Sequence, residues 1–131
     1  MKVLIDTQII LWVLMDSARL TSREKEILND EQNEIFCHPI SFFEISLKFS
    51  LGKLDLQGCE PQGIPALMEE VGFLIEVAEP AVFASCHQLP RGIHKDPFDR
   101  LLIWHCMSKD YHLLSRDRMM GKYAQHGLKV L

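Results

Sequence analysis

The sequence has no long apolar run. A membrane-spanning helix needs roughly 18 to 20 consecutive apolar residues, and no segment of the chain reaches that length. The N-terminal stretch MKVLIDTQIILWVL carries an aspartate inside its apolar part and has no small-residue cleavage site, which argues against a signal peptide. We therefore expect a cytoplasmic protein that has no membrane partner.

Cysteine is scarce and is not arranged in pairs. The four cysteines, Cys37, Cys59, Cys86 and Cys106, lie twenty or more residues apart, so the C-x-x-C pair typical of zinc and redox sites is absent. Three of them are adjacent to a histidine in the sequence, but adjacent side chains on a strand or helix diverge. Because structural zinc needs four converging ligands, we expect reduced thiols rather than a zinc site.

The chain also lacks an excess of positive charge. Its formal net charge is −4 at pH 7, which excludes a protein that holds nucleic acid by bulk attraction to phosphate. A nucleic-acid ligand would need a local basic rim, a bound cation or a partner. The 131 residues are 47% hydrophobic and 24% charged, which is typical of one soluble globular domain, residues 1–131. Such a chain buries a core without disulfides or a structural metal.

Strand-like and helix-like segments alternate along the chain. Short apolar runs predict strands at residues 2–5, 34–37, 73–77, 112–115 and 128–131. Apolar periodicity, proline at first helical positions and terminal glycines predict helices at residues 9–14, 65–71, 81–89, 97–108 and 118–123. Residues 53–65 are rich in Gly, Pro and Gln and are expected to form a loop with a short helical turn.

Two further helices are predicted from their start signals. Thr21 is followed three residues later by Glu24, which is the spacing of a capping box. Ser41 and Glu44 repeat that spacing and predict a helix that ends at Gly52. Strands that alternate with helices form right-handed βαβ units. The predicted fold class is therefore α/β, a single domain with a mainly parallel central sheet and helices on both faces.

Acidic residues stand at the predicted carboxyl ends of the strands, which is where α/β folds bind ligands. They are Asp6, Glu44, Asp96, Asp99 and Asp117. Each has a plain structural explanation as a helix cap, a first-turn carboxylate or a turn residue. Together they repel one another and raise one another's pKa unless a cation neutralises them. A cluster of carboxylate oxygens selects Mg or Mn over softer metals.

Four sequence strings resemble the motif regions of PIN-domain ribonucleases, in the same order and spacing. They are LIDTQIILWVL, SFFEISLKFSLGKL, HKDPFDRLLIWHC and LLSRDRMMGKY. They are most similar to the VapC-type toxins of bacterial toxin–antitoxin modules, whose signature runs D-T-H-x-L-L-W, W-E-I-x-x-K-x-x-x-G-K-L, H-R-D-P-F-D-R and T-x-D. The resemblance extends over essentially the whole chain.

This resemblance implies a PIN-like fold and a metal-dependent endoribonuclease that uses Mg or Mn. It places Asp6, Glu44, Asp99 and Asp117 on the acidic quartet that is catalytic and holds the metal, Asp96 on an accessory acid, and Thr7 and Ser115 on accessory hydroxyl positions. It also implies RNA as the substrate, including tRNA or other structured or single-stranded RNA, a cognate antitoxin protein as partner, and a homodimer. The apolar stripes of the first and third helices are core or interface, and periodicity alone does not separate these cases.

The sequence departs from the family pattern at several positions. Gln8 stands where the pattern has His, Phe43 where it has Trp, and Lys95 where it has Arg. Trp104 and His105 stand where small or amide side chains are common. None of these changes removes a carboxylate, so the sequence predicts an active site that is intact.

Basic residues lie within the same motif segments. The candidate RNA contacts are Lys48, Lys95, Arg100, Arg116 and Arg118, and Lys53 and Lys122 lie in the same segments. An equally good interpretation pairs Lys48 with Glu44 at i, i+4 and leaves the other cations as solvated helix ends.

Other functional classes fit less well. A receiver-like Mg-binding signalling domain needs an acidic pair after the first strand, but Asp6 stands alone there. A HAD-type phosphatase needs D-x-D at that position, and Gln8 occupies the second place. A catalytically silent binding scaffold with the same fold is the remaining alternative, and the intact quartet argues against it.

Overall fold

The computed structural model describes residues 1–131, and its centre is a five-stranded sheet in the order β3-β2-β1-β4-β5. All four strand pairs are parallel. The strands are β1 (Lys2–Ile5), β2 (Glu34–Cys37), β3 (Leu74–Ile75), β4 (His112–Leu114) and β5 (Lys129–Val130). The α-helices are α1 (Thr7–Met15), α2 (Ser22–Asn29), α3 (Pro39–Ser50), α4 (Ile64–Val71), α5 (Pro80–Ser85) and α6 (Pro97–Lys109). Short 3₁₀ helices are η1 (Ser17–Arg19), η2 (Pro61–Gly63), η3 (Cys86–Gln88) and η4 (Arg118–His126). The predicted α/β class with a parallel sheet is confirmed.

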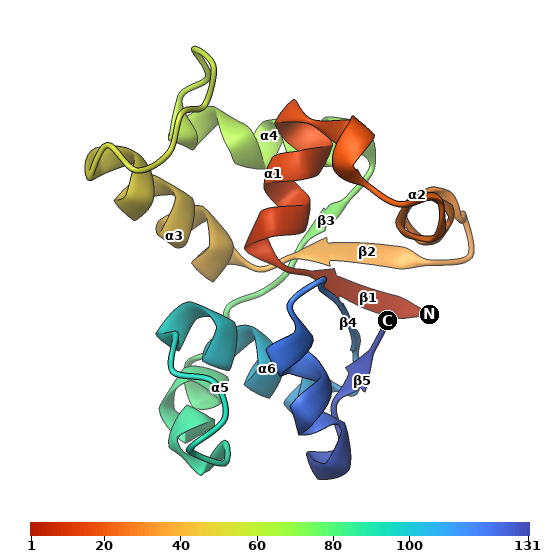
Figure 1. Cartoon of the computed structure of the whole chain (residues 1–131), viewed down its shortest axis with the longest axis vertical. Coiled ribbons are helices and arrows are strands. Elements are labelled where there is room, and N and C mark those ends of the chain that lie inside the picture. Colours follow the sequence, from red (N-terminus) through yellow and green to blue (C-terminus); the bar gives the residue numbers. More distant parts are fainter.

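Both faces of the sheet are covered, so its strands are continuous apolar runs. Val3 and Ile5 of β1 point into one core, which also contains apolar side chains of α1, α2 and α4. Leu4, between them, points into a second core, which contains apolar side chains of α6 and η4. Figure 1 shows these two layers, with α1 and α4 on one side of the sheet and α5 and α6 on the other.

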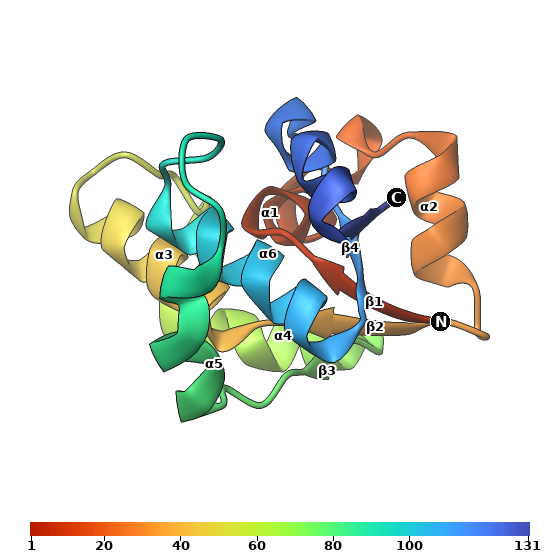
Figure 2. The same ribbon diagram turned by 90° about the horizontal axis from the view of Figure 1, so that it is seen from below.

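Helix α3 lies at the carboxyl edge of the sheet and contacts both α1 and α6. Figure 2 shows α3 at the end of the molecule toward which β1 and β2 point. This edge is therefore bordered by helices from both layers, and the segments that follow β1, β2 and β4 meet there.

Helix α3 begins earlier than the sequence predicted. It starts at Pro39, and the Nδ1 atom of His38 accepts a hydrogen bond from the Ile40 N–H at 3.0 Å as the N-terminal cap. The predicted capping box at Ser41 and Glu44 is therefore wrong, because both residues already lie inside the helix. Proline at the first helical position fixes φ and lacks an unsatisfied N–H, which favours this earlier start.

Three other predicted elements are shorter or different in type. Strand β3 has two residues rather than the five of residues 73–77, because it pairs only with the end of β2 at Phe36 and Cys37. The predicted helix at 81–89 is α5 followed by the 3₁₀ helix η3, and η4 is a 3₁₀ helix as well. All four cysteines are free, and Cys37 and Cys106 are buried. None of the helices has the length and apolar character that crossing a membrane requires.

Candidate active site

One cavity at the carboxyl edge of the sheet collects acidic side chains from four parts of the chain. Its volume is about 420 Å³, within the usual range for ligand sites. The acidic residues that line it are Asp6, Glu44, Asp96, Asp99 and Asp117. The remaining lining residues include Thr7, Gln8, Trp12, Lys48 and Arg116. All five acids predicted from the sequence therefore meet, although Asp6 and Asp117 are 111 residues apart in the chain.

Asp6 follows β1 directly and caps α1. Its Oδ1 atom accepts a hydrogen bond from the Ile9 N–H at 2.9 Å, and the residue is buried. Burial raises the pKa of Asp6, and the negative charges of Asp117 and Glu44 raise it further. Hydrogen bonds from the Ser115 hydroxyl and the Ile9 N–H act in the opposite direction. Asp6 is thus both a structural cap and a member of the acidic cluster.

Glu44 lies one turn into α3 and is also buried. The Thr7 hydroxyl donates a hydrogen bond to its Oε1 atom at 2.7 Å, and the Ser41 Oγ atom lies 3.0 Å from the same hydroxyl. Lys48 pairs with the other carboxylate oxygen, as the i, i+4 spacing predicted. Thr7 thereby connects the start of α1 to α3 and fixes the position of Glu44 at the cavity.

Asp96 and Asp99 stand at the start of α6. The Oδ1 atom of Asp96 accepts hydrogen bonds from the N–H groups of Phe98 at 2.8 Å and Asp99 at 3.3 Å. Burial and the neighbouring Asp96 charge raise the pKa of Asp99 to about 7, although His94 lowers it. A carboxyl group whose pKa is raised this far has too little positive charge around it. This is the electrostatic environment that a bound cation would relieve.

Asp117 follows β4 and caps η4. Its Oδ1 atom accepts a hydrogen bond from the Met119 N–H, and its Oδ2 atom lies 2.9 Å from the Nε2 atom of His94. Burial raises its pKa, but the His94 hydrogen bond and the Met119 N–H outweigh burial, so the pKa of Asp117 is lowered overall. Ser115 completes this segment, because its Oγ atom accepts a hydrogen bond from the Asp117 N–H at 3.1 Å.

His94 is a site residue that the sequence argument missed. Its Nε2 atom also lies 3.3 Å from Asp99, so the ring joins two carboxylates of the cluster. His94, Asp99 and Asp117 offer ligand atoms within 4.8 Å of one another. The available signal was its place as the first residue of the string HKDPFDRLLIWHC, which already contained two of the predicted acids.

The basic residues of the motif segments have different positions. The guanidinium of Arg100 donates to the carbonyls of Leu89, Pro90 and His94, so it holds the loop before α6. Arg116 lines the cavity. Lys95 and Arg118 are exposed, and Lys48 faces the cavity while its side chain is 46% exposed.

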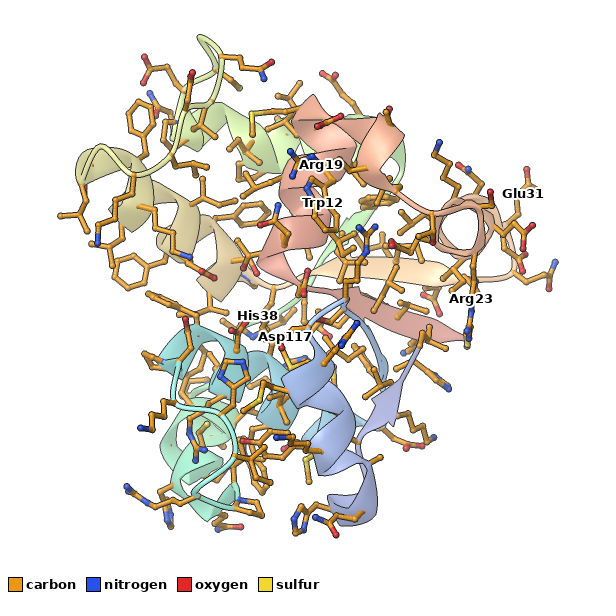
Figure 3. The ribbon with its side chains drawn as sticks, in the orientation of Figure 1. Trp12, Arg19, Arg23, Glu31, His38 and Asp117 are labelled. Carbon is orange, nitrogen blue, oxygen red and sulfur yellow. The ribbon has the colours of Figure 1, made fainter.

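Arg116 is held by residues that the sequence argument did not connect with it. Its guanidinium pairs with Glu24 of α2, donates to the Arg19 carbonyl at 2.7 Å and stacks on Trp12 at 4.1 Å. Figure 3 labels Trp12 and Arg19 side by side over α1 and η1. Trp12 and Gln8 line the cavity as well, so α1 contributes one wall of the site.

The residues around the cavity fit a divalent cation. Five carboxylates face two cations, Lys48 and Arg116, and both of these are already paired with glutamates. Carboxylate oxygens are the ligands that Mg and Mn prefer. Burial is the main cause of the raised pKa of Asp99 and of Asp6, and the neighbouring carboxylates raise both further, so a bound cation would relieve both carboxylates.

Several proteins of known structure have folds similar to that of this chain. The crystal structure of VapBC2 from Rickettsia felis bound to a promoter DNA fragment matches with a TM-score of 0.65 and 14% identity, over 100% of this chain and 98% of that chain. FitAcB from Neisseria gonorrhoeae matches with a TM-score of 0.58 and 19% identity, over 98% and 96%. FitAB bound to the IR36 DNA fragment matches with a TM-score of 0.59 and 18% identity, over 98% and 93%.

At these identities, the structural matches establish the fold. No curated protein sequence matches the chain significantly. The sequence profile of the PIN domain family, in contrast, matches residues 3–125. That match covers nearly the whole chain and includes all five acids of the cavity. The chain therefore belongs to the PIN domain family.

Proposed function

We propose that this protein is a metal-dependent endoribonuclease and the toxin component of a VapC-type toxin–antitoxin pair, acting in the cytoplasm. The observation that carries the proposal is the convergence of five carboxylates on one cavity, with the pKa of Asp99 raised to about 7. Membership of the PIN domain family supports nuclease chemistry. Three similar structures, described as VapBC2, FitAcB and FitAB, support the toxin assignment.

In this proposal the carboxylates hold Mg or Mn. Asp6 and Asp99 are the principal ligands, and Asp117 and Glu44 complete the site directly or through water. A divalent cation in such a site supplies a bound water of lowered pKa and neutralises charge that develops on the phosphodiester. Thr7 holds Glu44, and Ser115 donates to Asp6, so these hydroxyls orient the carboxylates.

RNA binding in this proposal depends on the cations around the cavity. Lys48 and Arg116 line it, and the exposed Lys95 and Arg118 lie next to Asp96 and Asp117 in the sequence. Arg100 is engaged with three backbone carbonyls, so we assign it to the loop rather than to the substrate. Single-stranded or looped RNA fits best, because its flexible backbone can approach a shallow acidic cavity.

The test is cleavage of a mixed small-RNA pool by the purified chain with Mg, with Mn and with EDTA. Asp99→Asn is run in parallel, and Glu31→Gln is the control because Glu31 is exposed and lies far from Asp117 (Figure 3). We expect discrete cuts that require metal, disappear with Asp99→Asn and persist with Glu31→Gln. Metal binding without cleavage of any RNA would favour the catalytically silent scaffold.

The antitoxin in this proposal binds the exposed apolar side of α3. Phe43 and Leu47, one turn apart on this helix, are 58% and 38% exposed, whereas the apolar residues Ile9, Ile10 and Leu11 of α1 are buried. Phe43 also packs edge-to-face against Phe98, which precedes Asp99. A segment that covers Phe43 would therefore reach the cavity, which explains how a partner could silence the enzyme.

Phe43→Ser tests this surface. The substitution should weaken capture of the co-expressed antitoxin at least tenfold, and it should lower the stability of the free chain by only about 0.5 to 1.5 kcal/mol, because the contact with Phe98 is lost. Sedimentation of the free chain then tests whether a second copy of the chain binds this surface instead. A homodimer that dissociates with Phe43→Ser would assign the surface to the second copy. Unchanged antitoxin affinity and unchanged mass would remove α3 from both interfaces.

A further inference from the structure

His94 joins two parts of the chain that the fold brings together from 23 residues apart. Its Nε2 atom lies 2.9 Å from the Oδ2 atom of Asp117, which follows β4, and 3.3 Å from the Oδ2 atom of Asp99, on the first turn of α6. Its side chain is only 12% exposed, so these contacts are shielded from water. No other side chain lies within ion-pair distance of both carboxylates.

The other ring nitrogen determines which role His94 can have. The Asp96 N–H donates a hydrogen bond to Nδ1 at 3.3 Å, so Nδ1 is an acceptor. A neutral imidazole then carries its proton on Nε2. That nitrogen donates to Asp117, also faces Asp99 at 3.3 Å, and has no lone pair left for a metal. The geometry thus favours a hydrogen-bond donor behind the carboxylates over a metal ligand.

The backbone of His94 is fixed as firmly as its ring. Its N–H donates to the hydroxyl of Tyr123 at 3.0 Å, and its carbonyl accepts from Arg100 at 3.2 Å. Tyr123 is fully buried in η4, the helix that Asp117 caps, and Arg100 follows Asp99 on α6. The two elements that carry the carboxylates therefore also hold the residue that joins them, which closes a ring of contacts.

We propose that His94 is a positioning residue that holds Asp99 and Asp117 at the separation a divalent cation requires. This inference rests on the proposed metal-dependent nuclease. Asp117 is anchored at both oxygens, by the Met119 N–H and by His94, and only His94 extends that anchoring to Asp99. Partners that orient metal-binding carboxylates typically contribute 10- to 100-fold to metal affinity.

Mn²⁺ affinity measured by calorimetry tests the proposal without any RNA. His94→Ala should bind Mn²⁺ about 10- to 100-fold more weakly than the wild type. His94→Gln should recover most of the affinity, because the glutamine amide nitrogen can replace the Nε2–H donor. Tyr123→Phe removes only the acceptor for the His94 backbone and should cause a smaller loss. His87→Ala, at an exposed histidine of η3, is the control.

Pulsed electron paramagnetic resonance of the Mn²⁺ complex provides the second readout. We expect no directly coordinated nitrogen in the wild type, because Nε2 carries a proton. A strong ¹⁴N coupling that disappears with His94→Ala would make His94 a ligand and overturn the positioning role. Equal Mn²⁺ affinity of His94→Ala and wild type would overturn the inference and leave the nuclease proposal intact. Failure of the wild type to bind Mn²⁺ would overturn both.

Discussion

Two polar clusters lie at the carboxyl edge of the same sheet and differ in how their charge is balanced. The acidic cluster, defined as Asp6, Glu44, Asp96, Asp99 and Asp117, opens into the cavity beside β1 and β4. The imidazole cluster, defined as His38, His105 and Glu76, is closed between the end of β2 and α6. Figure 3 labels one residue of each, Asp117 and His38, between the two helical layers.

The imidazole cluster balances its charge internally. The Nε2 atom of His105 lies 3.1 Å from Glu76, and the rings of His105 and His38 meet edge to face at 4.7 Å. Burial is the main reason that the pKa of His38 is lowered to about 4, and the nearby His105 lowers it further while Glu76 opposes both. His38 Nε2 and His105 Nδ1 have no hydrogen-bond partner. The cluster therefore lowers the stability of the fold, because these two ring nitrogens are removed from water without gaining a partner. It is also closed to ligands.

In the acidic cluster, only the contacts with His94 and Lys48 offset the negative charge of the carboxylates. Its excess negative charge faces a cavity instead of a neighbouring side chain, so a ligand can supply the missing charge. The difference teaches that buried ionisable residues alone do not identify a site. A candidate site is identified by uncompensated charge of one sign that lies next to a cavity.

The largest expected effect is the loss of RNA cleavage when the acidic cluster loses a carboxylate. Asp99→Asn should reduce RNA cleavage by more than about 100-fold, because loss of a ligand should exceed the loss typical of an orienting partner. At pH 7 and above, the metal-free variant should be more stable than the wild type by an amount on the order of 2 kcal/mol, because a carboxylate that is partly buried and crowded by like charges is removed. Urea denaturation measures this gain, and reduced stability would show that Asp99 is structural.

Metal addition should act on the acidic cluster alone. At a Mn²⁺ concentration about 100 times the dissociation constant, binding should stabilise the wild type by about 2.7 kcal/mol. Thermal unfolding with and without EDTA measures the effect. Mn²⁺ should stabilise Asp99→Asn little or not at all. It should stabilise His38→Asn as much as the wild type, because the imidazole cluster does not bind the cation. An equal response of Asp99→Asn would place the cation elsewhere.

Acid should act on the imidazole cluster. The folded pKa of His38, about 4, is below its unfolded value of 6.5, so the unfolded chain takes up the proton first as the pH falls. The contribution of His38 to the free energy of unfolding should therefore fall between pH 6.5 and pH 4, by an amount on the order of 2 kcal/mol, whereas Asp99, whose folded pKa is raised to about 7, acts in the opposite direction over this range in the metal-free protein.

His38→Asn sharpens this test, because asparagine also caps helices and could still accept from the Ile40 N–H. The variant should show a shallower loss of stability in that pH range, measured by urea denaturation at each pH. His87→Asn, at an exposed histidine, should follow the wild type. A wild-type slope in His38→Asn would assign the acid sensitivity to another group.

The smallest expected effect concerns the cation that borders the acidic cluster. Lys48 is nearly half exposed, so its pair with Glu44 should contribute no more than about 0.5 kcal/mol to stability. Lys48→Met should therefore unfold at almost the same urea concentration as the wild type, yet bind a non-cleavable RNA more weakly with a reduced salt dependence. Unchanged RNA affinity would show that Lys48 does not contact RNA and only forms the i, i+4 pair with Glu44.

Local signals predicted much of the fold and the acids of the site. The strand at residues 2–5, the helix cap at Thr21 and the helix opened by Pro97 all appear in the structure, because each depends on residues adjacent in the chain, whereas the Glu24 carboxylate of the predicted capping box binds Arg116 instead. Asp96 is a helix cap, as its plain structural explanation predicted. Asp6 and Asp117, explained there as turn residues, are helix caps as well, and all three line the cavity. For these residues the structural and functional interpretations describe one arrangement.

Other features were out of reach because they depend on distant residues. Pro39 moved the start of α3 and placed Ser41 inside the helix, where Thr7 reaches it. Arg116 has a contact with Glu24 that spans 92 residues, which no local pattern announces. Strand β3 ended early because its only neighbour is the end of β2.

The sequence by itself determined the alternation of strands and helices and the placement of Asp6 after β1, Asp117 after β4, and Asp96 and Asp99 at the start of α6. Those properties follow from hydrophobic period and helix capping, which act over a few residues. Only the tertiary structure decided that His94 joins Asp99 to Asp117, that Arg100 serves a loop, and that His38 and His105 close on each other. Burial and charge compensation arise from packing between segments, so they exist only once the chain has folded.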